Sequence, residues 1–112
     1  MEFDVNRPIY LQICDSLSES ILTGEIKPDE RILSVREYAA QIGVNPNTVA
    51  RSYEALTSDG IIYNKRGIGY FVSAVAPQKV LESARQSFYE NELPQFVKRM
   101  RLLNISFEDI MK

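Results

Sequence analysis

Two helix-start signals lie close together in the middle of this 112-residue chain, and they constrain its fold more than any other feature. Ser34 and Glu37 match a capping box, in which each side chain accepts a hydrogen bond from the other residue's backbone amide. Asn45 followed by Pro46 is a second start, because Asn favours the N-cap and Pro suits the first helical position. Gly43 stands between the two signals and suits a helix end. The segment therefore predicts two short helices joined by a tight turn, the helix-turn-helix pattern.

The apolar periodicity supports these two helices and predicts a longer one before them. The longer helix follows Pro8 and ends near Gly24, with apolar residues recurring every four positions. Its expected inward residues are Ile9, Ile13, Leu17 and Ile21, with Tyr10 and Cys14 widening the stripe. In the two short helices the expected inward residues are Val35, Tyr38, Ala39 and Ile42, then Val49, Tyr53 and Leu56. We interpret Cys14 as a small core side chain rather than a redox group.

A change of periodicity after residue 60 predicts a β-hairpin. The β-prone runs 61–64 and 70–73 flank residues 65–69, whose sequence Lys-Arg-Gly-Ile-Gly is typical of a hairpin tip. Helix, helix-turn-helix and hairpin, in that order, predict a winged helix-turn-helix domain over residues 1–75. The expected fold class is mainly α with a small β-hairpin, followed by a short α-helical C-terminal tail.

The tail over residues 76–112 returns to a helical pattern. Asn91 and Pro94 predict a break or kink, because a proline inside a helix removes a hydrogen bond, and Ser106 predicts the cap of a last short helix. So short a tail cannot bury its own apolar faces. We therefore expect it to pack on the first domain, on a second copy of the chain, or on both. The candidate dimer contacts are Phe88, Phe96, Val97, Met100 and Leu103.

Composition argues against an enzyme, a metal site and a cofactor. The chain has no histidine and one cysteine, which removes the commonest general base, every Ser/His or Cys/His pair and any plausible zinc site. Its apolar runs are far shorter than the ~20 residues that span a bilayer. The N-terminus also lacks the basic and apolar regions of a signal peptide. We expect a cytoplasmic protein that does not bind a membrane.

Charge is distributed unevenly along the chain. The formal net charge is −2, which by itself argues against a nucleic-acid partner. Residues 31–73 carry five basic and three acidic side chains, whereas residues 1–30 carry two basic and seven acidic ones. Because the local field governs binding, the middle of the chain permits a nucleic-acid-binding face.

The start of the third helix carries side chains suited to reading DNA. A recognition helix presents its N-terminal residues to base edges in the major groove, where Asn can bind adenine and Arg can bind guanine or a phosphate. The candidates there are Asn45, Asn47, Thr48 and Arg51. Other interpretations stay open: Asn45 can serve only as a cap, Thr48 can merely fill the helix turn, and Arg51 can form a surface pair with Glu54.

The second helix and the hairpin tip add further candidates. Ser34 and Arg36 lie at a positive helix end, where a cation is unfavourable unless it meets an anion such as a DNA phosphate. A surface pair between Arg36 and Glu37 or Asp29 is the alternative. At the tip, Lys65 and Arg66 offer two positive charges.

Gly67 and Gly69 let the hairpin backbone approach a minor groove about 6 Å wide. A plain tight turn is the alternative, while a nucleotide-phosphate loop is disfavoured because the segment joins two strands. We expect at least one of Gly67→Ala and Gly69→Ala to keep its melting temperature while losing DNA affinity, which is the behaviour expected where the glycine has a negative φ.

Five stretches, taken in order, resemble the GntR family of bacterial transcription factors. They are residues 8–13 (Pro-Ile-Tyr-Leu-Gln-Ile), 21–28 (Ile-Leu-Thr-Gly-Glu-Ile-Lys-Pro), 34–37 (Ser-Val-Arg-Glu), 44–53 (Val-Asn-Pro-Asn-Thr-Val-Ala-Arg-Ser-Tyr) and 66–72 (Arg-Gly-Ile-Gly-Tyr-Phe-Val). The Asn-Pro-Asn-Thr-Val-x-Arg stretch and the short tail are similar to the YtrA subfamily. The resemblance covers residues 8–73 closely and the tail more loosely.

This resemblance implies a homodimer that binds a palindromic double-stranded operator, usually as a repressor and often of neighbouring transporter operons. It implies that the tail dimerises, since the tail is too short for the effector-binding domain of larger members, and no small-molecule effector is evident. The family's DNA-contacting positions correspond to Arg36, residues 45–48, Arg51 and residues 67–69. Other subfamilies have an arginine where this chain has Ala50, so base-reading roles do not transfer between subfamilies.

One loop departs from the family pattern. Residues 28–34 read Pro-Asp-Glu-Arg-Ile-Leu-Ser, where the family usually has Pro-Gly-Asp-Arg-Leu-Pro-Ser. The family pattern therefore does not predict the backbone conformation of this turn, although it still predicts the fold.

A protein-interaction module is the alternative function, because winged helices also serve as docking domains. The outer face of the third helix distinguishes the two. Polar and basic residues there suit DNA, whereas an exposed apolar patch would suit a protein partner.

Overall fold

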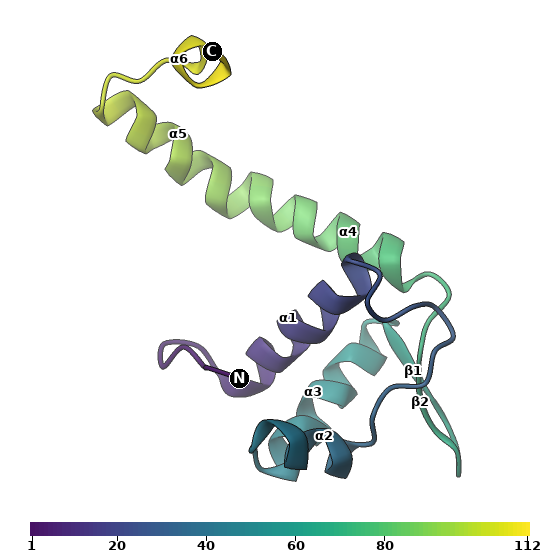
Figure 1. Cartoon of the computed structure of the whole chain (residues 1–112). Helices are drawn as coiled ribbons and strands as arrows, with labels where there is room; N and C mark the ends of the chain where they lie inside the picture. The colour runs from purple at the N-terminus through teal and green to yellow at the C-terminus, as the bar shows by residue number, and fades with distance from the viewer. The chain divides into compact units, whose positions relative to one another are not determined.

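The computed structural model describes residues Met1–Lys112, which form two compact units, Met1–Val80 and Leu81–Lys112. The first unit contains α1 (Ile9–Leu22), α2 (Val35–Ile42), α3 (Pro46–Ser58), β1 (Ile62–Lys65) and β2 (Gly69–Val72) (Figure 1). This is the mainly helical winged helix-turn-helix that the sequence predicts. The units divide after Val80 rather than after residue 75, because Ala76 and Val80 of α4 (Ala76–Ser87) are buried in the core of the first unit.

The helix boundaries follow the capping signals. The Ser34 hydroxyl accepts a hydrogen bond from the Glu37 amide at 3.1 Å, and the Glu37 carboxylate accepts one from the Ser34 amide at 3.1 Å. The Asn45 side chain accepts a hydrogen bond from the Asn47 amide at 2.8 Å. Gly43 ends α2 in the left-handed conformation, with φ 70°. All these contacts are local, which is why the sequence reveals them.

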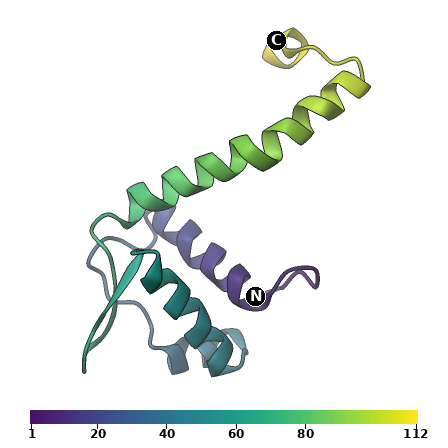
Figure 2. The same cartoon turned by 180° about the vertical axis from the view of Figure 1, so that it is seen from behind.

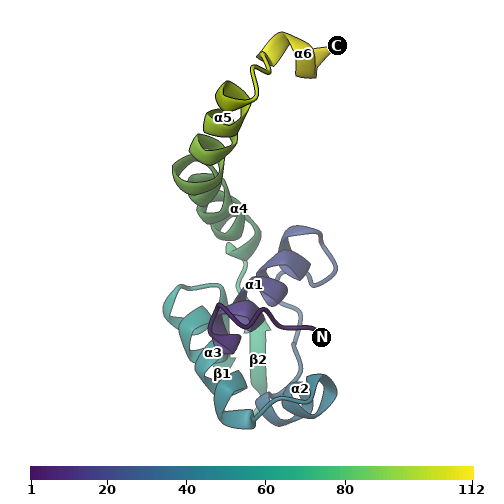
Figure 3. The same ribbon diagram turned by 90° about the vertical axis from the view of Figure 1, so that its left-hand side faces the viewer.

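The core of the first unit is organised around α3, which packs against α1, α2 and β1 (Figures 1 and 3). The expected inward residues Val49, Tyr53 and Leu56 are buried, and Ser52 joins them. The Tyr53 hydroxyl donates a hydrogen bond of 2.6 Å to the Leu33 carbonyl, and its ring meets Tyr70 edge-on at 5.0 Å. On α1 the buried residues are Ile13, Leu17 and Ile21, whereas Ile9 stays exposed.

The hairpin is antiparallel, with Ile62 opposite Val72 and Lys65 opposite Gly69. A third segment, residues 30–32, pairs with the edge of β2 that faces away from β1. The Ile32 amide donates to the Tyr70 carbonyl at 3.0 Å, and the Val72 amide donates to the Glu30 carbonyl at 3.0 Å. We call residues 62–72 the wing.

The loop that departs from the family pattern adopts a left-handed turn without a glycine. Asp29, which stands where the family usually has Gly, has φ 63°. Asp tolerates this conformation better than most residues, because its short side chain can hydrogen-bond locally. Its carboxylate accepts a hydrogen bond of 3.1 Å from the Tyr63 hydroxyl on β1.

The second unit is helical and nearly coreless. From Leu81 the helix runs through a π-helical turn (Phe88–Glu92) into α5 (Leu93–Leu102), and α6 (Phe107–Met111) follows after a short turn (Figure 2). The expected break is thus a widened turn, in which the Leu93 amide donates to the Phe88 carbonyl. Pro94 then falls in the first turn of α5, where its missing amide costs little. Ser106 caps α6 as expected, through a capping box with Asp109.

The capping box of α2 predicts an acid-sensitive part of the stability. Hydrogen bonds with the Ser34 backbone and side chain hold the pKa of Glu37 below its ordinary value. A lowered pKa adds stability above the unfolded-state pKa of about 4.3, and this stability is lost as pH falls through the folded-state pKa. For Glu37→Gln, which keeps the shape without the charge, we expect a lower Tm than wild type at neutral pH. The difference should close in acid.

Thermal melts followed by circular dichroism at a series of pH values measure this difference. Asp109, whose pKa is also lowered by its cap, is common to both proteins and cancels in the comparison. A Tm difference that stayed constant down to about pH 2 would contradict a role for the Glu37 charge.

Candidate nucleic-acid interface

The N-terminal turns of α3 carry the first group of candidate residues. Asn45 is engaged as the N-cap, so its side-chain oxygen is already used within the protein. Asn47 is exposed, and its side-chain amide makes no hydrogen bond in the chain. Thr48 is half-buried. Of the three, Asn47 is therefore the residue that the fold leaves free to meet a partner.

Arg51 is exposed one turn farther along α3, and it does not pair with Glu54. Its guanidinium lies instead over the ring of Tyr10 on α1, with 3.9 Å between Cζ and the ring centroid. Such stacking occupies the flat face of the guanidinium and leaves the N–H groups at its edge available. The sequence places Tyr10 on the apolar stripe of the first helix and does not reveal it as part of this site, because the contact joins two helices far apart in the chain.

Arg36 on α2 is also exposed and unpaired. The two carboxylates considered as its partners are engaged elsewhere, Glu37 by the Ser34 amide and Asp29 by the Tyr63 hydroxyl. Ser34 itself is occupied by the capping box. Arg7 of the N-terminal segment does form an ion pair, with Asp15 at 3.0 Å. The cations of α2, α3 and the wing are therefore not neutralised by direct partners.

The two basic residues of the wing differ in their surroundings. The Lys65 ammonium lies over the Phe71 ring, 4.7 Å from its centroid, on a face where Phe71 stacks with Tyr63. Arg66 is exposed in the loop between the strands. The wing tip thus offers one cation held against its aromatic face and one projecting from the turn.

Both glycines of the wing tip have a positive φ, 80° at Gly67 and 144° at Gly69. The negative φ on which the expected tolerance of alanine depends is found at neither position, because the tight reversal from β1 into β2 places both in conformations that L side chains rarely adopt. Alanine at either position would therefore strain the turn itself. A Cβ on Gly67 would meet nothing within 4 Å, whereas one on Gly69 would lie 2.9 Å from the Arg31 Nε.

Arg31 is a second residue that sequence reasoning missed. It forms an isolated bridge with Phe71 of β2, which brings its side chain beside Gly69. The bridge joins segments forty residues apart, and no local pattern in the sequence signals it. The cationic group at the wing tip therefore contains Arg31 as well as Lys65 and Arg66.

No cluster of three or more His, Cys, Asp or Glu side chains is arranged to hold a metal ion. None of the helices combines the length and the apolar character that a membrane crossing requires.

Comparisons with known proteins agree with this geometry. Residues 9–72 match the family described as bacterial regulatory proteins, gntR family. Over 111 residues the chain is 33% identical to the uncharacterised HTH-type transcriptional regulator YhcF of Bacillus subtilis, covering 99% of this chain and 90% of YhcF. Over 103 residues it is 34% identical to the HTH-type transcriptional repressor YtrA of the same organism, covering 92% of this chain and 78% of YtrA.

Solved structures extend the similarity to three dimensions. A GntR family transcriptional regulator from Listeria monocytogenes aligns with a TM-score of 0.81 at 33% identity, covering 97% of this chain and 94% of that one. AraR(DBD) in complex with operator ORX1 aligns with a TM-score of 0.58 at 34% identity, covering 60% of this chain and 81% of that one. The chain belongs to the GntR family and is a DNA-binding transcriptional regulator on a winged helix-turn-helix, not an enzyme.

Proposed function

We propose that the protein is a repressor that binds a palindromic operator as a homodimer, reading bases with α3 and gripping the backbone with the wing. The observation that carries the proposal is the outer face of α3, where Asn47 and Arg51 are exposed and not paired with any acidic side chain. Amide and guanidinium groups are the side chains best suited to base edges in the major groove. Repression is supported by two similar proteins named as repressors, YtrA and NagR of Bacillus subtilis.

The alternative of a protein-docking module finds no support on this face. No large apolar side chain of α2 or α3 is exposed, and an apolar patch is what a protein partner would need there. The one exposed large apolar residue of the wing is Ile68. A single residue of this kind is ordinary on a protein surface.

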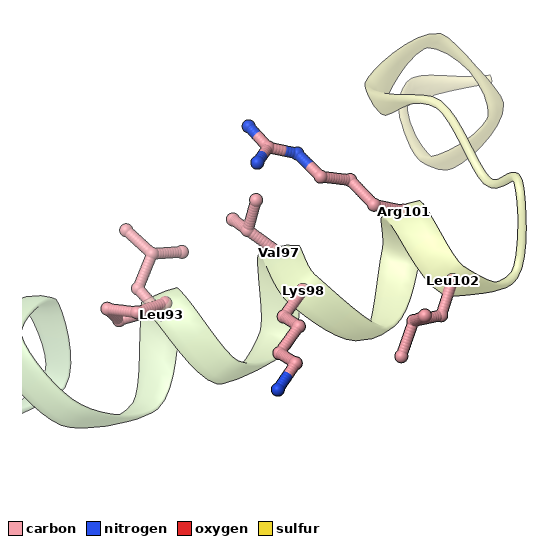
Figure 4. A pocket seen from close by; sticks show the side chains of 6 residues that line it. Leu93, Val97, Lys98, Arg101 and Leu102 are labelled. Carbon is pink, nitrogen blue, oxygen red and sulfur yellow. The ribbon is translucent and has the colours of Figure 1, made fainter.

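The second unit supports the dimeric part of the proposal. Its sole buried residue is Met100, and its exposed apolar side chains include Phe88, Phe96 and Leu103, at 44%, 53% and 58% exposure. Val97 lines a groove of about 550 Å³ along α5 with Leu93, Pro94 and Leu102 (Figure 4). Burying these residues against a second copy would supply association energy at about 25 cal/mol per Å² of apolar surface. Because Met100 is already buried, we leave it out of the proposed contact.

A dimer also fits the form of the proposed target. A twofold axis relating two α3 helices matches a DNA site with two inverted half-sites, about one helical turn or a multiple of it apart. Genome-wide footprinting of the protein would reveal both the operator and its symmetry. Recovery of sites without inverted half-sites would contradict this proposal.

Asn47→Ala or Arg51→Ala should each weaken operator binding by about 1–3 kcal/mol and relax the preference at one operator position. The reason is that each variant removes donors from the face that we place in the major groove. Fluorescence-anisotropy titrations give the affinity, and sequencing of DNA selected from a randomised operator gives the preference. Ser58→Ala, exposed at the far end of α3, is the matched control and should change neither. If both site variants kept wild-type selectivity, α3 would not be the reading element.

Lys65→Ala or Arg66→Ala should weaken binding to operator and unrelated DNA alike. Each removes a phosphate contact, so the slope of log K against log salt should flatten by about 1. Titrations at several salt concentrations on both kinds of DNA measure it. Lys79→Ala, a cation outside the wing whose ammonium donates to the Asp59 carbonyl, is the control. A change of base preference in the wing variants would argue that the wing reads sequence instead.

Phe96→Asp should convert the dimer to a monomer, because it places an unpaired carboxylate in an apolar contact. We expect the dimer Kd to rise roughly 30-fold or more, as for a hot-spot loss of about 2 kcal/mol. Sedimentation velocity across a concentration series measures it, and Val5→Asp, at another exposed apolar residue, is the control. A chain ending after Val80, which keeps the core residues Ala76 and Val80, should also be monomeric. A dimer that survived both changes would place the interface elsewhere.

A further inference from the structure

We propose that Tyr10 is a positioning residue for DNA recognition, which holds the guanidinium of Arg51 in the orientation that the operator requires. The inference rests on the proposed role of Arg51 as a DNA contact, and it adds a residue of α1 to a surface otherwise built from α2, α3 and the wing.

The backbone of Tyr10 is fixed against α3 by a partly buried hydrogen bond. Ser52, the neighbour of Arg51, is fully buried at 0% exposure, and its hydroxyl lies 2.7 Å from the Tyr10 carbonyl, to which it donates. The Thr48 carbonyl is a second, longer acceptor at 3.2 Å. A second contact beside it, from the Cys14 thiol to the Ser52 carbonyl at 3.5 Å, joins the same two helices. The crossing of α1 and α3 therefore places residue 10 next to residue 51 whatever the side chain at position 10.

The aromatic ring of Tyr10 then determines where the guanidinium lies. The 3.9 Å between the Arg51 Cζ and the ring centroid is well inside the range of a cation–π contact. An exposed arginine loses rotamer freedom when it binds, and a side chain already held in place loses less. Because the ring covers only the face of the guanidinium, the edge donors stay free for a phosphate or a base.

The ring also competes with an acidic neighbour. Glu54 lies three residues after Arg51 on the same helix, a spacing at which oppositely charged side chains meet. The two do not form an ion pair while Arg51 is stacked on Tyr10. Without an aromatic ring at position 10, the guanidinium becomes free to pair with Glu54, and DNA must then break that pair.

A double-mutant cycle tests the proposal in the full-length protein. The variants are Tyr10→Leu, Tyr10→Phe, Arg51→Ala and the double variant Tyr10→Leu/Arg51→Ala. The probes are a fluorescein-labelled duplex of the site recovered by footprinting and a scrambled duplex of the same composition. Anisotropy gives the affinities, and thermal melts give the stability of each variant.

We expect Tyr10→Leu to weaken operator binding roughly 2- to 5-fold, as for the loss of an exposed cation–π contact. Tyr10→Phe, which keeps the ring, should bind like wild type. In the Arg51→Ala background, Tyr10→Leu should have no further effect, because the group that the ring positions is gone. The Ser52–Tyr10 hydrogen bond uses the backbone carbonyl, so Tm should change little. If Tyr10→Leu melts early, Tyr10→Met takes its place in the cycle.

Other outcomes overturn the proposal and separate it from the proposed function. Additive losses in the double variant would mean that residue 10 does not act through Arg51. A loss in Tyr10→Phe equal to that in Tyr10→Leu would assign the effect to the hydroxyl group. If Arg51→Ala weakens binding but Tyr10→Leu does not, only the role of Tyr10 fails. If Arg51→Ala itself has no effect on affinity or base preference, the proposed DNA contact of Arg51 fails as well.

Discussion

The burial of one face of α3 is the constraint on which the rest of the first unit depends. Val49, Ser52 and Tyr53 are fully buried, and Tyr53 alone reaches the loop before α2 through its hydroxyl and β2 through its contact with Tyr70. Because this face is held by neighbours on several sides, the helix cannot rotate without breaking the core. Its opposite face, with Asn47 and Arg51, is therefore presented in a fixed direction.

The sequence predicts whatever depends on near neighbours in the chain. The capping boxes, the Asn45 cap and the buried stripe of α3 all follow from spacings of a few residues. It does not predict contacts between distant segments, such as Arg31 beside Gly69 or Arg51 over Tyr10, because no local pattern encodes them. The signs of φ at Gly67 and Gly69 are not predicted either, since they depend on the register in which the two strands pair.

The two units differ in what stabilises them. The first has a continuous core that includes Ile13, Val49, Tyr53 and Val72, whereas the second buries Met100 alone. A segment that lacks a core gains stability from whatever covers its apolar side chains, so its folding and its association are linked by mass action. In the proposed dimer, a higher protein concentration would then increase the folded fraction of residues 81–112 as well as the occupancy of the operator.

The π-helical turn of the tail contains one residue more than an α-helical turn, and it sets the phase of the whole helix. Because the Leu93 amide bonds to the Phe88 carbonyl, these two residues lie one above the other although five positions separate them. The helix after the turn therefore keeps the same rotation about its axis, relative to the helix before the turn, as it would have in an α-helix that is one residue shorter. A homologous chain with one residue fewer here would present the same surface through an unbroken α-helix. A one-residue gap at this point in a sequence alignment would therefore indicate that an α-helical turn replaces the π-helical turn. It would not indicate that a different face of the tail is exposed.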